Sequence, residues 1–246
     1  MVFIRIMSDA SVLKSKTALI FGGGRGLGRS IAMACAKAGA EVAIVSRSRD
    51  ELSRVSEEIA ASGGTSLALV GEATDQVRVT EIVEEMVKKL GKIDILVNCQ
   101  GESLIKPILS TSMDEFDRII DVNLRSVYIT CKAAIEQMVK QKSGCIINIS
   151  SRVGVTGAAS VAAYSAAKAG VIGLSKALAL ELKGQNIKVN VIGPAPMDTP
   201  MRWKATPDYD RKKVIAPERV AGLVVVLASM PDTFLEDVLV PISVNS

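Results

Sequence analysis

The sequence predicts an α/β fold with a doubly wound sheet of seven parallel strands and helices on both faces. Two patterns lead to this prediction. Short apolar runs of strand length alternate with longer stretches in which apolar residues recur every three or four positions. The chain has 246 residues, of which 48% are hydrophobic, and this suits a single domain with one large core.

The apolar runs predict strands at 17–21, 41–46, 65–70, 93–98, 145–150, 188–192 and 238–242. The helical periodicity between them predicts helices at 26–37, 50–61, 75–90, a long stretch ending near Lys140, 161–183 and 217–229. Parallel crossovers are right-handed in nearly all proteins, which places these helices on both faces of the sheet. We expect an N-terminal extension at 1–13 and one domain at 14–246. Within it, the irregular stretch 193–216 holds four prolines and the only tryptophan, and we interpret it as a substrate lid.

Composition excludes several function classes. The net charge of +4 comes from dispersed Lys and Arg without interleaved aromatics, so we expect no nucleic-acid partner. No apolar run is long enough to cross a bilayer, and the first seven residues lack the features of a signal peptide, so we expect a cytoplasmic protein. Histidine is absent, which removes His-based triads and the commonest metal ligand, and we expect no metal site. The four cysteines have no zinc or disulfide spacing and are interpreted as buried thiols.

A glycine-rich segment follows the first predicted strand and opens the first predicted helix. This context is typical of a Rossmann-type dinucleotide site, because the turn is tight and the helix N-terminus offers free N–H groups to a pyrophosphate. A purely structural loop is the alternative, and the position after strand one disfavours it. The candidate cofactor-binding residues here are Gly22, Gly24, Arg25, Gly26, Leu27 and Gly28.

The end of the second predicted strand bears on the choice between NAD(H) and NADP(H). An acidic side chain there commonly holds the ribose 2′-OH of NAD, but this strand ends in Ser46 and Arg47. Arg47, joined by Arg25, suits a 2′-phosphate because a guanidinium forms bidentate, charge-assisted hydrogen bonds. We therefore expect NADP(H) to be preferred over NAD(H). Two ordinary surface arginines are the alternative.

Tyr164 and Lys168 are four residues apart near the start of a helical stretch, so both side chains lie on one face. A nearby ammonium, helped by the charge of an oxidised nicotinamide, is expected to lower the pKa of the tyrosine and let it exchange a proton. The spacing alone is a frequent coincidence on helices. Ser151, which follows a predicted strand just upstream, offers a hydroxyl at the strand's carboxyl end and favours a catalytic site.

With these motifs, the sequence resembles the short-chain dehydrogenase/reductase family from about Lys16 to at least Leu227. The glycines match the family's TGxxxGxG loop, and residues 98–101 match its NNAG motif. Four further positions match the family's catalytic tetrad: Asn123, Ser151, Tyr164 and Lys168. Pro194 and Thr199 match the segment that holds the nicotinamide carboxamide in the family.

This resemblance implies a role for each matched residue. Ser151 orients the substrate oxygen, Tyr164 exchanges its proton, Lys168 tunes Tyr164 and contacts the nicotinamide ribose, and Asn123 anchors a water that leads to Lys168. Hydride moves between the nicotinamide and the carbon that bears this oxygen. The further cofactor-binding residues that it implies are Glu72, Ala73, Asn98, Gln100, Gly101, Pro194 and Thr199, besides Tyr164 and Lys168.

The sequence also departs from the family pattern. Phe21 replaces a threonine, Cys99 and Gln100 replace the Asn and Ala of NNAG, Glu72 stands where an aspartate commonly meets the adenine, and Ala195 replaces a glycine. Each departure is expected to affect cofactor affinity without removing a catalytic group. The stretch between Thr199 and Pro217 is short for a lid, and the tail at 234–246 lacks the family's YxTG and terminal glycine pair. The resemblance implies a homodimer or homotetramer.

The substrate is expected to be a small carbonyl or alcohol compound. Arg152, Arg202 and Lys204 are suited to an anion, although solvated lid charges are the simpler interpretation. Within the family, the sequence resembles the 3-oxoacyl-carrier-protein reductases. Lys140 and Lys142 suit the acidic partner of those enzymes, whereas Gln185 does not. A general carbonyl reductase is the other enzymatic hypothesis. An NADP(H)-binding sensor or scaffold with little turnover is the alternative from a different class.

Overall fold

A seven-stranded parallel sheet forms the centre of the computed structural model, which describes residues 11–230 and 239–242. Its strand order is β3-β2-β1-β4-β5-β6-β7, which confirms the predicted doubly wound sheet. The strands are β1 (Thr17–Phe21), β2 (Glu41–Ser46), β3 (Ser66–Val70), β4 (Ile95–Asn98), β5 (Gly144–Ile149), β6 (Ile187–Pro194) and β7 (Leu239–Ile242).

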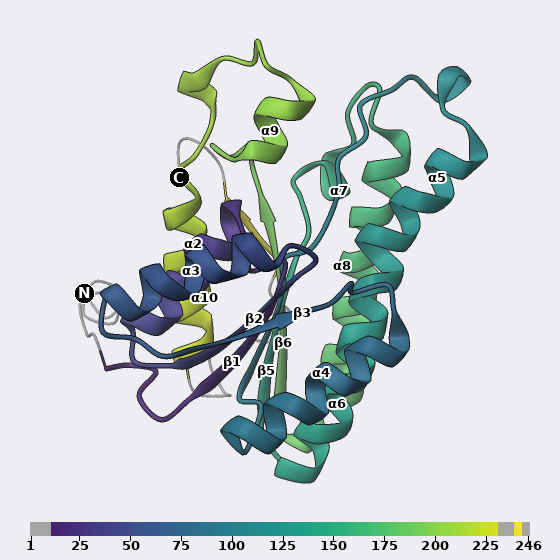
Figure 1. Cartoon of the computed structure of the whole chain (residues 1–246). Helices are drawn as coiled ribbons and strands as arrows, with labels where there is room; N and C mark the ends of the chain where they lie inside the picture. Colours follow the sequence, from purple (N-terminus) through teal and green to yellow (C-terminus); the bar gives the residue numbers. More distant parts are fainter. Residues whose placement is uncertain (1–10, 231–238, 243–246) are drawn as a thin grey trace.

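Helices cover both faces of the sheet, as predicted (Figure 1). One layer contains α2 (Gly26–Lys37), α3 (Arg49–Ala61) and α10 (Pro217–Ser229), and its core includes Ile31, Leu52 and Val224. The opposite layer contains α4 (Gln76–Leu90), α6 (Ser126–Gln141) and α8 (Ala162–Leu182). Alternate strand residues enter the two layers, which is why the strands are apolar throughout. No described helix is long and apolar enough to cross a membrane.

The order of the strands changes direction between β1 and β4, which makes this place the topological switch point of the sheet. From β1 it adds β2 and β3 on one side, and then returns to add β4 and β5 on the other side. The carboxyl ends of parallel strands beside such a switch point form the crevice where open α/β sheets bind ligands. The glycine-rich segment, residues 99–101 and Ser151 all follow strands at this edge.

The long helix predicted to end near Lys140 is divided into three parts. They are α5 (Met113–Ile120), the π-helical turn η2 (Asp121–Arg125) and α6. Asn123 lies in the π turn, and its side-chain amide donates to the backbone oxygens of Ile119 and Glu102, both at 2.9 Å. Apolar periodicity does not distinguish a π turn from an α-helical one, so the sequence pattern missed this interruption.

The predicted lid contains more regular structure than its prolines suggested. Thr199 caps α9 (Pro200–Ala205), and the turn η4 (Arg211–Lys213) follows. The short helix α7 (Val153–Thr156) was also not predicted. Two short 3-10 helices, η1 (Ile108–Ser110) and η3 (Lys183–Gln185), are the remaining elements of the described residues. Residues 1–10 of the predicted extension and most of the predicted tail departures lie outside the described residues. Leu13 is buried, and its N–H donates to the Ala38 oxygen at 2.8 Å.

Candidate active site

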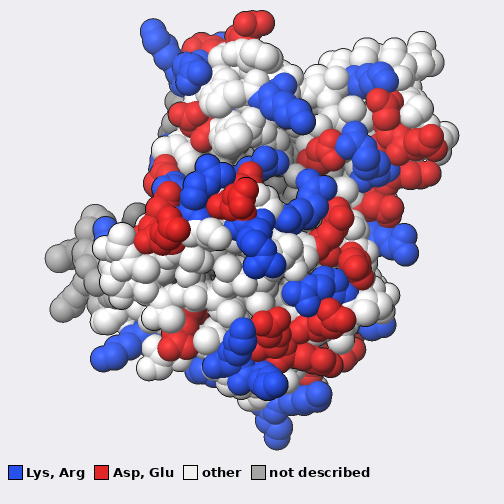
Figure 2. All heavy atoms as spheres, in the orientation of Figure 1, with Lys and Arg blue, Asp and Glu red and all other residues white. Residues whose placement is uncertain are grey.

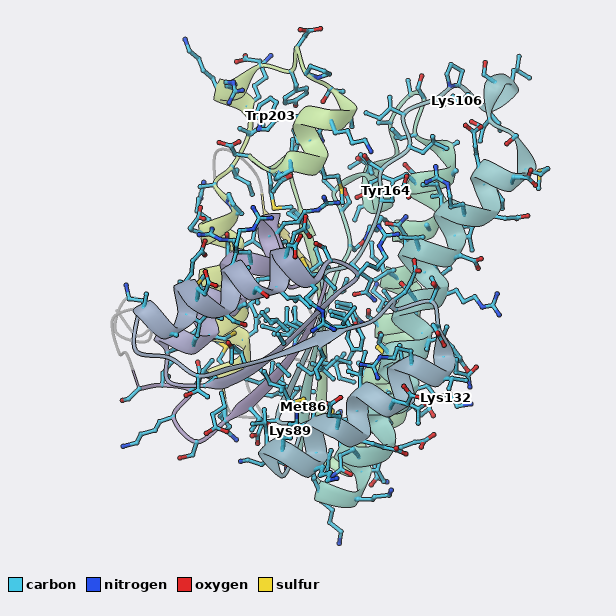
Figure 3. All side chains as sticks on the ribbon, viewed as in Figure 1. Met86, Lys89, Lys106, Lys132, Tyr164 and Trp203 are labelled. Carbon is cyan, nitrogen blue, oxygen red and sulfur yellow. The ribbon has the colours of Figure 1, made fainter. Side chains whose placement is uncertain are left out.

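A cleft of about 300 Å³ lies at the carboxyl ends of β1, β2, β4 and β5. The predicted residues that line it are Gly22, Gly24, Arg25, Gly26, Leu27, Gly28, Ser46, Arg47, Glu72, Ala73, Gln100, Gly101, Tyr164, Lys168 and Thr199. Figure 3 shows Tyr164 below the lid segment that carries Trp203. Positive and negative side chains adjoin one another in the middle of this face of the molecule (Figure 2).

The glycine-rich loop has no room for side chains at its two ends. A Cβ on Gly28 would lie 2.0 Å from the Gly22 oxygen, so the first turn of α2 is pressed directly against the loop. Gly22 has a φ of +78°, and a Cβ there would lie 2.8 Å from the Gln100 nitrogen. Arg25 precedes α2 without a side-chain cap, which leaves the N–H groups of the first turn to bind an anion. These features fit a bound dinucleotide pyrophosphate.

Both arginines predicted to bind a 2′-phosphate are held in ion pairs. Arg25 Nη1 lies 3.3 Å from Glu51 Oε1, and Arg47 Nη1 lies 3.4 Å from Glu72 Oε1. Glu51 lines the cleft, and sequence reasoning missed it because it searched for a carboxylate only at the end of β2. A signal was available in the pattern Ser48-x-x-Glu51, which marks a helix start and predicts a carboxylate in the first turn of α3.

The catalytic candidates come from three elements. Tyr164 and Lys168 lie one turn apart on α8, and the Lys168 Nζ is 5.8 Å from the centroid of the Tyr164 ring. Ser151 follows β5, and its hydroxyl lies close enough to Tyr164 to favour the ionised phenol. Lys168 is 4% exposed, and its ammonium donates to the Ile149 oxygen at 3.0 Å. The structure therefore brings a hydroxyl, a phenol and an amine together beside the glycine loop.

Burial dominates the electrostatics of this group. Burial lowers the pKa of Lys168 from 10.5 to about 8. Burial also raises the pKa of Tyr164, although the Ser151 hydrogen bond and the charge of Arg202 act in the opposite direction. The predicted lowering of the Tyr164 pKa includes the positive charge of an oxidised nicotinamide, so it stays a prediction for the site with its cofactor. Desolvation of the phenolate outweighs the neighbouring charges.

Four predicted residues do not line the cleft. Asn123 is fully buried behind it, where its side-chain oxygen accepts from the Glu102 N–H at 3.2 Å, and a Cβ on Gly101 would lie 2.7 Å from that oxygen. Ser151 lies beside Tyr164, which does line the cleft. Pro194 ends β6, and Asn98 is turned into the core.

Asn98 belongs to a buried polar network that supports the floor of the cleft. Its amide donates to the Asn148 oxygen at 2.8 Å, and its own oxygen accepts from the Thr130 hydroxyl at 2.7 Å. Asn148 in turn donates to the Ser175 hydroxyl on α8 at 2.9 Å. The network thus joins β4 and β5 to the helix that carries Tyr164. This arrangement makes the side chain of Asn98 structural.

Several lining residues were not predicted as site residues. Cys99, for which the sequence predicted a buried thiol, is only partly buried and borders the cleft. The other three cysteines are buried. The remaining unpredicted lining residues include Ser48, Glu51, Gly71, Thr74, Val122, Ser126 and Ser150, whereas Met197, Pro200 and Met201 belong to the stretch 197–204 that the sequence predicted to line the pocket. Ser48, Gly71, Thr74 and Ser150 follow strand ends, and only the sheet order shows that these ends meet.

Comparison with known proteins identifies the family. The short chain dehydrogenase family matches residues 16–210. The chain belongs to the short-chain dehydrogenases. This dehydrogenase is accordingly an oxidoreductase that acts on C=O or CH–OH groups with a nicotinamide cofactor.

The dehydrogenase has similar relatives over most of its length. A 3-oxoacyl-[acyl-carrier-protein] reductase of Thermotoga maritima is 34% identical over 232 residues, which are 91% of this chain and 94% of the relative. The enzyme of that name from Staphylococcus aureus is 40% identical over 181 residues, 73% of this chain and 74% of the relative.

Solved structures agree with this family. A short-chain type dehydrogenase/reductase from Mycobacterium marinum superposes with a TM-score of 0.90 and 33% identity over 96% of this dehydrogenase and 97% of that chain. Levodione reductase superposes with a TM-score of 0.89 and 28% identity over 95% and 98% of the two chains.

Proposed function

We propose that this dehydrogenase is an NADP(H)-preferring carbonyl reductase in which Ser151, Tyr164 and Lys168 are catalytic and Asn123 is a positioning residue. The observation that carries the proposal is that Tyr164 and buried Lys168 face each other in the cleft that the glycine loop lines, with Ser151 beside Tyr164. The glycine loop and the free end of α2 fit the pyrophosphate of the cofactor. When bound, the nicotinamide supplies or takes up the hydride.

The raised pKa of Tyr164 suits carbonyl reduction. A phenol that keeps its proton at neutral pH is able to donate it to the oxygen of a carbonyl as this oxygen gains negative charge. Ser151 orients that oxygen through its hydroxyl, and the Lys168 ammonium stabilises negative charge left on Tyr164. Oxidation of an alcohol requires the phenolate instead, so it is favoured at higher pH.

The proposed cofactor preference rests on Arg25 and Arg47. Both line the cleft within its adenosine end, together with Ser46, and both are more than half exposed. A guanidinium binds a phosphate dianion in a bidentate manner. The end of β2 also has no carboxylate that would repel the phosphate. Each arginine has to share its charge with a glutamate, however, so we expect the preference to be moderate.

For the substrate, we propose a 3-oxoacyl thioester. Support comes from the names of the relatives and from Met201, which lines the cleft from α9 and is 40% exposed, so it offers apolar surface to an acyl chain. The test is NADPH oxidation with 3-oxoacyl thioesters of coenzyme A and of acyl-carrier protein, against simple ketones, diketones and quinones. Faster turnover of the thioesters supports the proposal, and turnover of simple ketones alone contradicts it.

We also propose that the dehydrogenase is cytoplasmic and forms a homodimer or homotetramer. A groove between α4 and α6 supports self-association, because exposed Tyr128 lies there among side chains of both charges, including Lys88 and Glu136. Light scattering coupled to gel filtration measures the mass. A monomer at micromolar concentration contradicts the proposal.

A further inference from the structure

Glu51 places a carboxylate at the adenosine end of the cleft. Its Oε1 lies 3.3 Å from the Nη1 of Arg25, and its side chain is 23% exposed, against 67% for Arg25. A Cβ on Gly24 would lie 3.1 Å from the Cβ of Glu51 and 2.7 Å from the Oγ of Ser46. The side chain therefore starts in contact with the glycine loop, beside the strand end that leads to Arg47.

The start of α3 fixes this position. Ser48 caps the helix, and its hydroxyl accepts from the Glu51 N–H at 3.3 Å. A negative charge in the first turn of a helix is stabilised by the free N–H groups and the helix dipole. The backbone thus holds the Glu51 carboxylate beside Arg25, where a 2′-phosphate would have to bind.

We propose that Glu51 is a specificity-determining residue that weakens the binding of a 2′-phosphate and so limits the preference for NADP(H). The inference rests on the proposed function, because it assumes that the adenosine end of the cofactor occupies this part of the cleft. Two like charges that share one guanidinium repel each other, and the guanidinium divides its hydrogen bonds between them. A ribose 2′-hydroxyl meets no such repulsion and is able to donate a hydrogen bond to the carboxylate.

A purely structural role for Glu51 makes a different prediction. In that case the Arg25–Glu51 pair only ties α2 to α3. A pair that joins α2 to α3 away from the cleft serves as a matched control: Arg29 Nε lies 2.6 Å from Glu58 Oε2. Neither Arg29 nor Glu58 lines the cleft. Loss of the two pairs would then have the same effect on stability and none on ligand selectivity.

The experiment compares two ligands that differ only by the phosphate in question. Isothermal titration calorimetry measures the binding of adenosine 2′,5′-bisphosphate and of 5′-AMP to the wild-type protein, Glu51→Gln and Glu58→Gln. For Glu51→Gln we expect the bisphosphate to bind about tenfold more tightly and 5′-AMP to change by less than about twofold. The gain should shrink as salt rises from 50 to 500 mM, because the lost repulsion is screened. Glu58→Gln should change neither ligand.

Unchanged or weaker binding of the bisphosphate to Glu51→Gln overturns the inference, as does an equal change in both ligands. Thermal unfolding of both variants identifies any general loss of structure. The proposed cofactor preference is tested separately by the wild-type protein. If wild type binds NADH as tightly as NADPH, the proposed preference fails, while a selective gain in Glu51→Gln still supports the role of Glu51.

Discussion

Replacing Lys168 by methionine should stabilise the cofactor-free protein while removing its activity. Lys168 is 4% exposed, and burial lowers its pKa from 10.5 to about 8. At 1.36 kcal/mol for each pKa unit, keeping this ammonium buried costs the folded state about 3 kcal/mol at neutral pH. Methionine has a similar length and no charge, but it loses the hydrogen bond to the Ile149 oxygen, worth about 1 kcal/mol. The net gain is about 2 kcal/mol.

The pH dependence of this gain follows from the sign of the pKa difference. The folded protein releases the Lys168 proton near pH 8, whereas the unfolded chain keeps it to pH 10.5, so wild-type stability rises between these values relative to the variant. Urea unfolding of both proteins at pH 7 and pH 10.5 measures this, and at pH 7 the melting temperature should rise by about 4–8 °C. A variant that is less stable than wild type at pH 7, or a difference that does not change with pH, refutes the reasoning.

Three further predictions concern the site. In a fluorescence titration, Gly28→Ala should weaken NADPH binding by at least about 100-fold, because its Cβ would lie 2.0 Å from the Gly22 oxygen. The control Gly173→Ala, in an open position on α8, should leave NADPH binding unchanged. Arg47→Ala should weaken NADPH more than NADH, by about tenfold, and an equal loss for both cofactors would count against a contact with the 2′-phosphate. The kcat/KM for carbonyl reduction should be level near pH 7 and decline through about pH 8, where Lys168 loses its charge; a rate that increases through this range would argue against the roles of Lys168 and protonated Tyr164.

The fold could be predicted from the sequence because local and long-range signals agree. The strands are short apolar runs, and helices such as α3 and α4 have a clear apolar stripe, so β1, β2 and α2 begin and end at the predicted residues. The π turn that contains Asn123 and the short helix α9 were missed. Both depend on side-chain contacts, the Asn123 amide with Ile119 and the Thr199 cap, rather than on periodicity.

The candidate site could be predicted in part. The loop glycines, Tyr164 and Lys168 could be recognised from short sequence motifs, because backbone shape and helical spacing are local properties. No local sequence signal shows that Glu51 lines the cleft or that the Asn98 side chain is buried. Both facts depend on which strand ends and helix starts meet in the folded chain. The rise in the pKa of Tyr164 through burial could not be predicted for the same reason. Its burial is produced by the whole cleft, and spacing along a helix does not show it.

The most direct measurement is NADPH oxidation at 340 nm with the carbonyl panel, for wild type and Tyr164→Phe, together with the NADPH dissociation constant of each. The phenyl ring keeps the packing and removes only the hydroxyl that is proposed to donate the proton. We predict NADPH-dependent turnover by wild type, a loss of at least about 100-fold in kcat for the variant, and NADPH binding that changes by less than about threefold. Turnover that survives in the variant, or NADPH binding by wild type without turnover of any carbonyl, would contradict a tyrosine-dependent reductase.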